Sequence, residues 1–314
     1  MAEQLAGVFW QGRYLAGANL MGANFYQANL ERANLDRADL RWTNLENVYA
    51  REASARNANL RDCWGQRINL ERACLEGADL TGAKFPFAFL YAIDLSHAHL
   101  EGTQLTGVNL SGAKLVGAKL INTDLQGAQL RNVNLAGATL IGCNFGEATL
   151  ADINFTAAKI MGGNFHGAGL ERIKLGQATI EGVDLSGATL IQVDPTSVGV
   201  TKIDLCGMNL DHVDLQGRDL SHRDFSATSL IGVNLYEADL SGVSFRDANL
   251  MSANLRKSRI GGACFDYAIL TGTDLSEITE FKGATFAGAN WWHARTGPGE
   301  GLKEYLGTLY PKSF

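Results

Sequence analysis

The sequence lacks the features that are typical of membrane-spanning proteins and of basic nucleic-acid-binding proteins. No stretch approaches about eighteen consecutive apolar residues, the length that a transmembrane helix needs. The formal net charge is -6, so no general excess of positive charge is present to hold nucleic acid. The first residues, MAEQLAGVFWQGRY, have neither a basic start nor a sustained apolar core. We therefore expect no signal peptide and a cytoplasmic location.

Cysteine and proline are also scarce, and the cysteines are placed irregularly. Five of them lie far apart in the sequence: Cys63, Cys74, Cys143, Cys206 and Cys264. Their odd number and wide spacing argue against a disulfide framework or a zinc site and indicate buried or incidental thiols. His97 and His99 offer two metal ligands, but no third ligand clearly joins them in the sequence. We therefore expect no metal and no cofactor.

What the sequence does have is a repeat of five residues. From Leu15 to Leu275 almost every fifth residue is Leu, Ile or Phe, and a small or β-branched residue usually stands two positions earlier. This period fits neither an α-helix, at 3.6 residues per turn, nor a plain strand, at two. It predicts a solenoid in which each unit forms one short extended piece and one corner, and whose core grows lengthwise.

A slower rhythm of twenty residues sets the number of sides. Phenylalanine recurs at central positions separated by multiples of twenty: Phe25, Phe85, Phe145, Phe165, Phe225, Phe245 and Phe265. Stacked side chains on one face prefer like partners, aromatic on aromatic and β-branched on β-branched. Twenty residues per turn and five per side together predict a coil with four sides.

The repeat resembles the A(D/N)LXX motif of the pentapeptide-repeat family. It occurs as Ala-Asn-Leu at 18–20 and as Ala-Asp-Leu at 38–40 and 238–240, and the resemblance covers residues 13–291. It implies an all-β solenoid, a right-handed quadrilateral β-helix with the central Leu or Phe and the preceding small residue inside. The handedness comes from the resemblance alone. An array of this length corresponds to about 13–14 coils.

Three segments are expected along the chain. Residues 1–14 are predicted to cap the first coil, residues 15–291 to form the β-helix, and residues 292–314 to form a C-terminal capping segment. Four residues of the last segment have the spacing of a short amphipathic α-helix: Leu302, Tyr305, Leu306 and Leu309. We interpret this helix as a cap over the open end. The alternative, suggested by the family, is a homodimer contact through residues 300–314.

The ladder is disturbed in three places. Small residues replace Leu at three central positions: Ala50, Ala55 and Gly65. The core there is underfilled, which predicts a bulge or repacking by Tyr49 or Trp64. Pro195 lacks the amide that would bond the next coil, so a local bulge is expected at its central position. One extra residue separates Leu275 from Phe281.

An outward aromatic cluster is the first candidate for a binding site. In the stretch KFPFAFLY, Phe87, Phe89 and Tyr91 occupy outward positions, and Trp64 lies one coil earlier. Contiguous exposed apolar area often marks a site for a partner. We therefore predict that these four residues contact another protein. The alternative is local packing beside the weak coil at Gly65.

An acidic band over residues 181–240 is the second candidate. Asp184, Asp204 and Asp224 share one column, so like charges are expected to stack. Some members of the pentapeptide-repeat family resemble double-stranded DNA in shape and charge and bind type II topoisomerases. The resemblance therefore suggests a DNA-mimicking modulator of gyrase. The alternative is that Asp and Asn are interchangeable in the repeat, and the mild net charge and the lack of a large loop favour it.

The sequence indicates no catalytic chemistry. It contains no phosphate-binding loop and no dinucleotide fingerprint. Active sites favour concave pockets, and a rod filled with Leu offers none. We interpret the chain as a non-enzymatic scaffold or regulator that binds another protein along its flat faces, without direct contact to nucleic acid or membrane. The DNA-mimicking modulator is the alternative.

Overall fold

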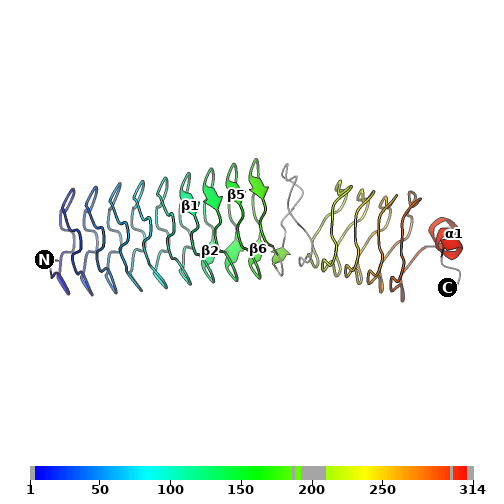
Figure 1. Cartoon of the computed structure of the whole chain (residues 1–314), viewed down its shortest axis with the longest axis horizontal. Helices are drawn as coiled ribbons and strands as arrows, with labels where there is room; N and C mark the ends of the chain where they lie inside the picture. Colours follow the sequence, from blue (N-terminus) through cyan, green and yellow to red (C-terminus); the bar gives the residue numbers. More distant parts are fainter. Residues whose placement is uncertain (1–3, 186–187, 192–209, 298–299, 310–314) are drawn as a thin grey trace. The chain divides into compact units, whose positions relative to one another are not determined.

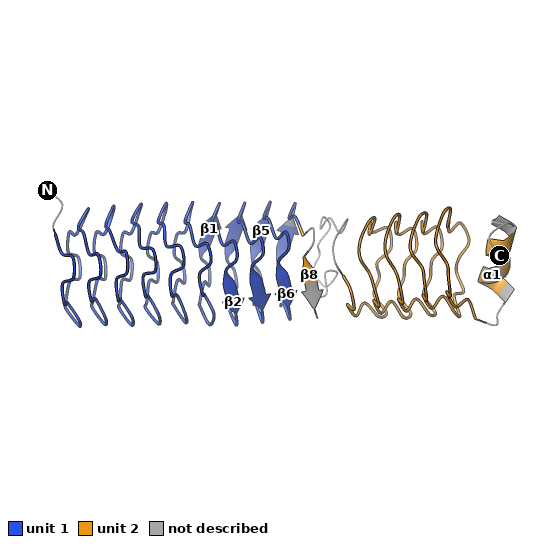
Figure 2. Ribbon diagram, turned by 90° about the horizontal axis from the view of Figure 1, so that it is seen from below, with its two compact units in different colours: residues 1–184, 197–203 blue, residues 185–196, 204–314 orange. Residues whose placement is uncertain are grey.

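The computed structural model describes residues 4–185, 188–191, 210–297 and 300–309. Within these residues the chain divides into two compact units, the first ending at Asp184 and the second beginning at Leu185 (Figure 2). Each unit is a series of coils whose neighbours run parallel (Figure 1). This arrangement confirms the predicted all-β solenoid.

Each coil takes twenty residues, and the hydrogen bonds show this directly. Asn24 forms a parallel bridge with Asn44 on the next coil. The amide of Leu20 donates to the carbonyl of Asp39 at 2.8 Å, and the amide of Ala23 closes a corner on the carbonyl of Leu20 at 3.0 Å. Because such a corner follows every five-residue unit, one coil has four sides. The twenty-residue rhythm of the sequence predicts this cross-section.

Two sides of the first unit are regular enough to form short strands (Figure 1). On one side the parallel strands are β1 (Lys119–Ile121), β3 (Thr139–Ile141), β5 (Lys159–Met161) and β7 (Thr179–Glu181). On another side they are β2 (Gln129–Arg131), β4 (Thr149–Ala151) and β6 (Gly169–Glu171). In the second unit lies β8 (Thr189–Ile191). Equivalent residues are in register, so Leu120 lies beside Leu140 and like side chains stack.

The inside of each unit is filled by the central residues and the small residues that precede them. The rings of Phe145 and Phe165 stack with their centroids 4.7 Å apart. In the second unit, three rings of the corresponding column stack at 5.5 and 5.0 Å: Phe225, Phe245 and Phe265. The buried hydroxyl of Thr123 donates to the carbonyl of Leu100 one coil earlier, at 2.7 Å. Within each unit the predicted stacking of these phenylalanines is therefore confirmed, and the buried Thr123 hydroxyl is hydrogen-bonded.

Left-handed backbone at the corners explains the frequent glycines there. Two residues after the centre, φ is 65° at Gly107 and 73° at Gly112, a region that glycine enters without strain. Other residues adopt the same conformation, with φ of 58° at both Arg37 and Phe87. Left-handed backbone costs a residue with a Cβ about 1–2 kcal/mol. A corner therefore displays a side chain outward at a modest cost.

The weak coil at Gly65 is filled from its neighbour. Trp64 and Tyr49 are 45% and 61% exposed, so neither turns inward, and both keep their regular bridges to adjacent coils. The buried ring of Phe85, one coil later, occupies the space instead, because a Cβ at Gly65 would lie 3.0 Å from two of its carbons. The predicted bulge, or repacking by Tyr49 or Trp64, is therefore wrong.

The ladder starts earlier than expected and carries its extra residue near the end. Three residues before Leu15 already bridge to the next coil: Gln4, Phe9 and Tyr14. They belong to the first coil because their positions continue the five-residue period, and they do not form a separate cap over it. After Leu275 the spacing grows, so Cys264 pairs with Thr285. The bulge predicted at Pro195 lies outside the described residues.

One helix, α1 (Glu300–Leu309), is present in the described chain and lies beyond the last coil of the second unit (Figure 1). Leu302 and Leu306 are buried, and the ring of Tyr305 lies 5.3 Å from that of Phe281. The apolar face that the sequence predicts is therefore the face that packs against the final coil.

Candidate interaction surface

The aromatic cluster predicted from the sequence lies in the first unit. Phe87, Phe89 and Tyr91 occupy outward positions of one coil and are 54%, 49% and 45% exposed. Trp64, 45% exposed, belongs to the preceding coil and bridges to Lys84. These four residues, Trp64, Phe87, Phe89 and Tyr91, are called the aromatic surface below.

Backbone alternation and one glycine position these rings. Phe85, Ala88 and Leu90 are buried, so the residues between them point outward. At the corner, the ring of Phe87 leans over Gly107 of the next coil, where a Cβ would lie 2.8 Å from two ring carbons. The absence of a side chain at Gly107 therefore gives the Phe87 ring its position.

These four rings have no aromatic or cationic partner. Within the described part of the chain, no second ring and no cationic group lies over any of them. Other exposed rings differ: the guanidinium carbon of Arg41 lies 5.5 Å from the Trp42 centroid, and that of Arg246 lies 5.2 Å from Tyr267. A cation over a ring satisfies the negative face of its π system. The rings of the aromatic surface lack such a cation.

A fifth ring lies close to the aromatic surface, and sequence reasoning did not assign it there. Tyr49 bridges to Asn69, and Asn69 bridges in turn to Phe89. The two aromatic residues therefore share one outward column, with a small amide between them. Their separation of forty residues, two coil lengths, is the sequence signal that places Tyr49 in this column.

The acidic column predicted from the sequence is not assembled within the described residues. Asp184 bridges to Asn164 in the first unit. Asp224 belongs to the second unit, where its carboxylate accepts the amide of Ser226 at 2.9 Å. Asp204 lies outside the described residues. The stacking of these three carboxylates therefore stays a prediction.

Cations of the following coil partly neutralise the end of the acidic band. The Nζ of Lys257 lies 3.5 Å from the carboxylate of Glu237, and Arg259 pairs with Asp239. Hydrogen bonds from Ser241 hold the pKa of Asp239 below its ordinary value, so this carboxylate is charged at neutral pH. Residues 257 and 259 lie beyond the band as the sequence delimits it. The net charge of the band therefore overstates the field it presents to a partner.

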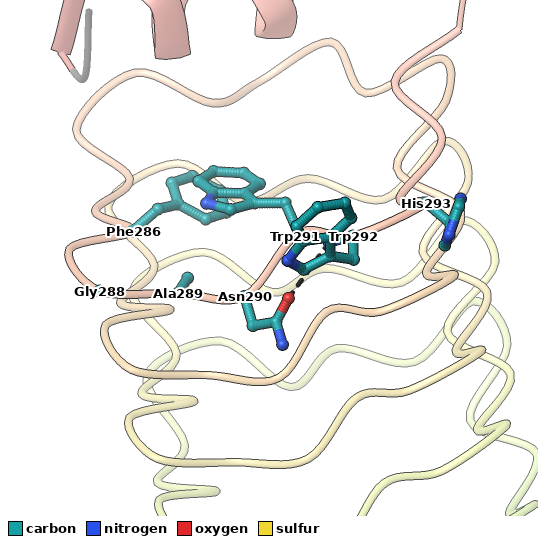
Figure 3. Close-up of a pocket in the computed structure, with 7 residues that line it drawn as sticks. All are labelled: Phe286, Gly288, Ala289, Asn290, Trp291, Trp292 and His293. Atoms are coloured by element: carbon teal, nitrogen blue, oxygen red, sulfur yellow. Dashed lines mark hydrogen bonds between the residues drawn. The ribbon is translucent and has the colours of Figure 1, made fainter. Parts of the chain in front are cut away.

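The last coil of the second unit borders a hollow of about 610 Å³ (Figure 3). The rings of Phe286 and Trp291 stack with their centroids 4.6 Å apart, and Trp292 is 73% exposed. Asn290 accepts the amide of Trp292 at 3.2 Å. His293 is the single titratable side chain of this lining, so the hollow contains no acid–base pair. The homodimer contact predicted for residues 300–314 stays a prediction.

Chemically reactive groups are few in the part of the chain that the structure describes. No three His, Cys, Asp or Glu side chains come together there as metal ligands. Burial raises the pKa of the Cys143 thiol to about 11 and also raises that of Cys63, so both stay protonated and unreactive at neutral pH. No described helix has the length and apolar character needed to cross a membrane.

Several solved structures are similar to this chain. QnrB1, a plasmid-mediated fluoroquinolone resistance protein, is 20% identical over 61% of this chain and 93% of its own, with a TM-score of 0.48. HetL, a pentapeptide repeat protein involved in heterocyst differentiation regulation in Nostoc sp. strain PCC 7120, is 24% identical over 93% and 87%, with a TM-score of 0.20. Rfr23 from Cyanothece 51142 is 31% identical over 35% and 62%, with a TM-score of 0.25. No curated protein matches the chain.

A family model described as pentapeptide repeats (8 copies) matches coils of both units. The matched residues are 4–37, 33–64, 73–112, 90–127, 113–150, 128–167, 140–177, 209–247, 219–256 and 228–266. These matches cover more than half of the chain, and they coincide with the stretches in which the twenty-residue bridges recur. The chain belongs to the pentapeptide-repeat family.

Proposed function

We propose that this protein is a non-enzymatic interaction module that binds another protein through the aromatic surface. The observation that carries the proposal is a row of three half-exposed rings on one coil, with a fourth on the preceding coil, none of them paired with another ring or a cation. The coils on either side carry Asn69 and Asn109 at the position of Phe89. The repeat itself therefore does not require a ring there.

Burial of these rings supplies a large share of a binding free energy. An aromatic side chain buries about 150–250 Å² in total. Apolar burial contributes about 25 cal/mol per Å². Trp and Tyr are also enriched among the few residues that dominate interfaces. Phe87, Phe89 and Tyr91, each about half exposed on one coil, therefore suit the centre of a protein–protein interface, with Trp64 on the adjoining side of the preceding coil.

The interior of the coils favours binding over catalysis. Central residues such as Leu95 and Leu100 are buried and fill the space within the coil. Chemistry on a small substrate needs a concave site with several convergent polar groups. The hollow at the last coil presents His293 as its one titratable group. The outer sides are therefore the parts of the molecule suited to recognition.

The alternative proposal, a DNA-mimicking modulator of a type II topoisomerase through residues 181–240, has weaker support. A phosphate mimic needs unpaired carboxylates at regular intervals. Glu237 and Asp239 instead pair with cations of the next coil. A supercoiling assay tests this alternative, and inhibition or protection of gyrase by micromolar protein would favour it over the aromatic surface.

Site-specific photo-crosslinking in cells of the source organism tests the main proposal. A benzophenone-bearing residue replaces Phe89 in one variant and Phe9 in the control. Both positions belong to one outward column of the first unit, and Phe9 is 73% exposed. We expect a discrete cross-linked protein from position 89 alone. No product at position 89, or the same products from both positions, contradicts the proposal.

A further inference from the structure

Three exposed cations surround the aromatic surface: Arg67, Arg72 and Lys84. The first two lie on the preceding coil, and their amides donate to the carbonyls of Pro86 at 3.2 Å and Tyr91 at 2.9 Å. The third lies on the same coil as the aromatic row and bridges to Trp64. Positive charge therefore borders the rings at both corners of this side and beside the indole.

These three cations form no ion pair within the described residues, although several of their basic neighbours do. Arg32 pairs with Glu52 at 2.9 Å, and Arg61 pairs with Asp79 at 3.2 Å. Two carboxylates lie close to the arginines: Glu71 stands between the two arginine corners, and Glu52, which pairs with Arg32, also interacts electrostatically with Arg72. The aromatic surface is thus bordered by a local excess of positive charge, on a chain whose formal net charge is -6.

We propose that the aromatic surface binds an acidic segment of a partner protein in which carboxylates alternate with apolar side chains. This inference rests on the proposed function, because it names the chemistry of the partner at the same surface. The apolar side chains cover the four rings, and the carboxylates pair with the three cations. Charge-assisted hydrogen bonds that a docked segment shields from water are stronger than fully exposed pairs.

The following coil leaves space beside the rings for such a segment. Its outward and corner residues are small: Gly107, Asn109, Ser111 and Gly112. The Phe87 ring already leans toward this coil. A segment that lies along the aromatic row therefore meets no bulky side chain on this side, and it reaches the arginines on the other.

The spacing of the cations fits separate carboxylates better than a phosphate backbone. Along its corner, Arg67 is followed one coil later by Phe87. Arg72 stands between Glu52 and Ala92 on its own corner. Single-stranded nucleic acid carries a phosphate on every nucleotide and is tracked by a continuous basic groove. Isolated cations next to rings instead match a peptide whose charges are spaced along its chain.

Fluorescence anisotropy with defined probes tests the inference on the whole chain. One probe is a short labelled peptide that alternates Glu with Leu and Phe. The second has Lys in place of each Glu, and the third is an oligothymidylate. All three are measured at low and at near-physiological salt, because pairing of exposed charges weakens as ions screen it.

Three variants keep the fold, because most of their new residues already occupy the same positions in other coils. The charge variant is Arg67→Gln/Arg72→Asn/Lys84→Gln, which copies Gln27, Asn132 and Gln104. The aromatic variant is Phe89→Asn/Tyr91→Ser, which copies Asn109 and Ser111. The control is Lys119→Thr/Lys159→Thr, on β1 and β5. Circular dichroism and urea midpoints establish that each variant is folded.

We expect the Glu peptide to bind the native protein and to lose about tenfold in affinity with either the charge or the aromatic variant. The control variant should bind as the native protein does. The charge variant should also show a weaker salt dependence, since it lacks the cations that salt screens.

Other outcomes overturn the inference. Equal binding of the Lys peptide, or unchanged binding to the charge variant with loss in the aromatic variant, overturns the acidic partner and leaves the proposed function standing. Binding of the oligothymidylate that requires the rings replaces the peptide with a nucleic acid. No binding of the Glu peptide also overturns the inference, and cross-linking at Phe89 then judges the proposed function by itself.

Discussion

At residue scale, the space at Gly65 is set by a side chain twenty positions later. A Cβ there would lie 3.0 Å from the Phe85 ring and 3.2 Å from the Cβ of Leu45. Both distances are shorter than ordinary van der Waals contact, so any side chain at this position has to displace the ring. Gly65 and Phe85, on two successive coils, therefore pack as a pair, and a change at one affects the other.

Gly65→Leu restores the usual residue of the repeat, yet we expect it to lower the free energy of unfolding by about 1–3 kcal/mol, because the site is already full. The double variant Gly65→Leu/Phe85→Leu should recover most of this loss. Urea denaturation of the two single variants and the double variant measures the coupling. A Gly65→Leu protein as stable as the native protein would show that the ring yields without cost.

Sequence predicts which residues lie inside, because the five-residue period assigns every position to the core or the surface. It therefore places Phe85 in the core and Phe87 and Phe89 outside, as the structure has them. It does not predict which neighbour fills the gap at Gly65. That depends on the direction of one ring relative to a coil twenty residues away.

At the scale of elements, α1 supplies hydrogen-bond partners to backbone groups of the last coil, which has no further coil to pair with. The hydroxyl of Tyr305 accepts the amide of Gly283 at 3.1 Å and lies 3.4 Å from the carbonyl of Ala284. Leu302 and Leu306 are buried. A coil end without such a cover presents free donors and acceptors, which invite pairing with another chain.

Leu306→Ala should loosen α1, because truncation of a buried leucine costs about 2–5 kcal/mol. We expect faster amide hydrogen exchange over residues 281–297 and little change in earlier coils, measured by mass spectrometry. Tyr305→Phe, which removes only the hydroxyl, should accelerate exchange near Gly283. Glu304→Gln, at an exposed position of the same helix, is the control. Equal exchange in all three variants would mean that α1 does not protect the final coil.

The apolar spacing predicts α1, whereas the start of the solenoid is harder to find from the sequence. Phe9 and Tyr14 look like a covering apolar segment, yet both are exposed. Their position in the period decides their direction, and it places them one residue before an inward position. Leu5 is buried, and it is the inward residue that shows that the ladder has already begun.

At the scale of the whole molecule, one column of the first unit carries charges that alternate in sign over three coils. Asp36, Arg56 and Glu76 occupy one position on three successive coils. Arg56 lies 3.9 Å from the carboxylate of Asp36 and 3.8 Å from that of Glu76. Each exposed pair is weak, and this column supplies two of them. A count of charges predicts only a solvated face. The coil length of twenty residues is what shows which charged side chains lie next to each other.

Acid should destabilise the protein. A hydrogen bond from Arg41 lowers the pKa of Asp39, and one from Arg172 lowers the pKa of Asp152. A carboxyl with a lowered folded pKa stabilises the fold above its unfolded pKa, and this contribution is lost as the pH falls through the folded value. We expect urea midpoints to be level from neutral pH to about 5 and to fall below about pH 4.

Arg172→Gln removes one of these partners and should make the acid dependence of the urea midpoint shallower. Arg37→Gln is a matched control, because Arg37 also lies at a corner with positive φ and forms no ion pair among the described residues. Midpoints that rise on acidification from pH near 5 to pH near 3 would contradict the sign of both pKa shifts.

The outward positions of the aromatic surface could be predicted, because the twenty-residue rhythm assigns each outward residue to a side and to a coil. The lack of a cation over its rings could not be predicted. Trp42 is as exposed as Phe89 but is covered by Arg41, and only the side-chain geometry separates the two. The acidic column was predicted by the same rhythm, and its members fall in two units and outside the described residues.

The fixed step of twenty residues between bridged positions constrains how such a chain is inherited. Duplication or loss of twenty residues adds or removes one whole coil and leaves every later side chain on the same side of the solenoid. An insertion or deletion of five residues between Tyr49 and Phe89 rotates all later coils by one side out of four. Phe89 would then lie on a different side from Tyr49. The single inserted residue after Leu275 stands just before the last coil, so it shifts the register of very few later residues.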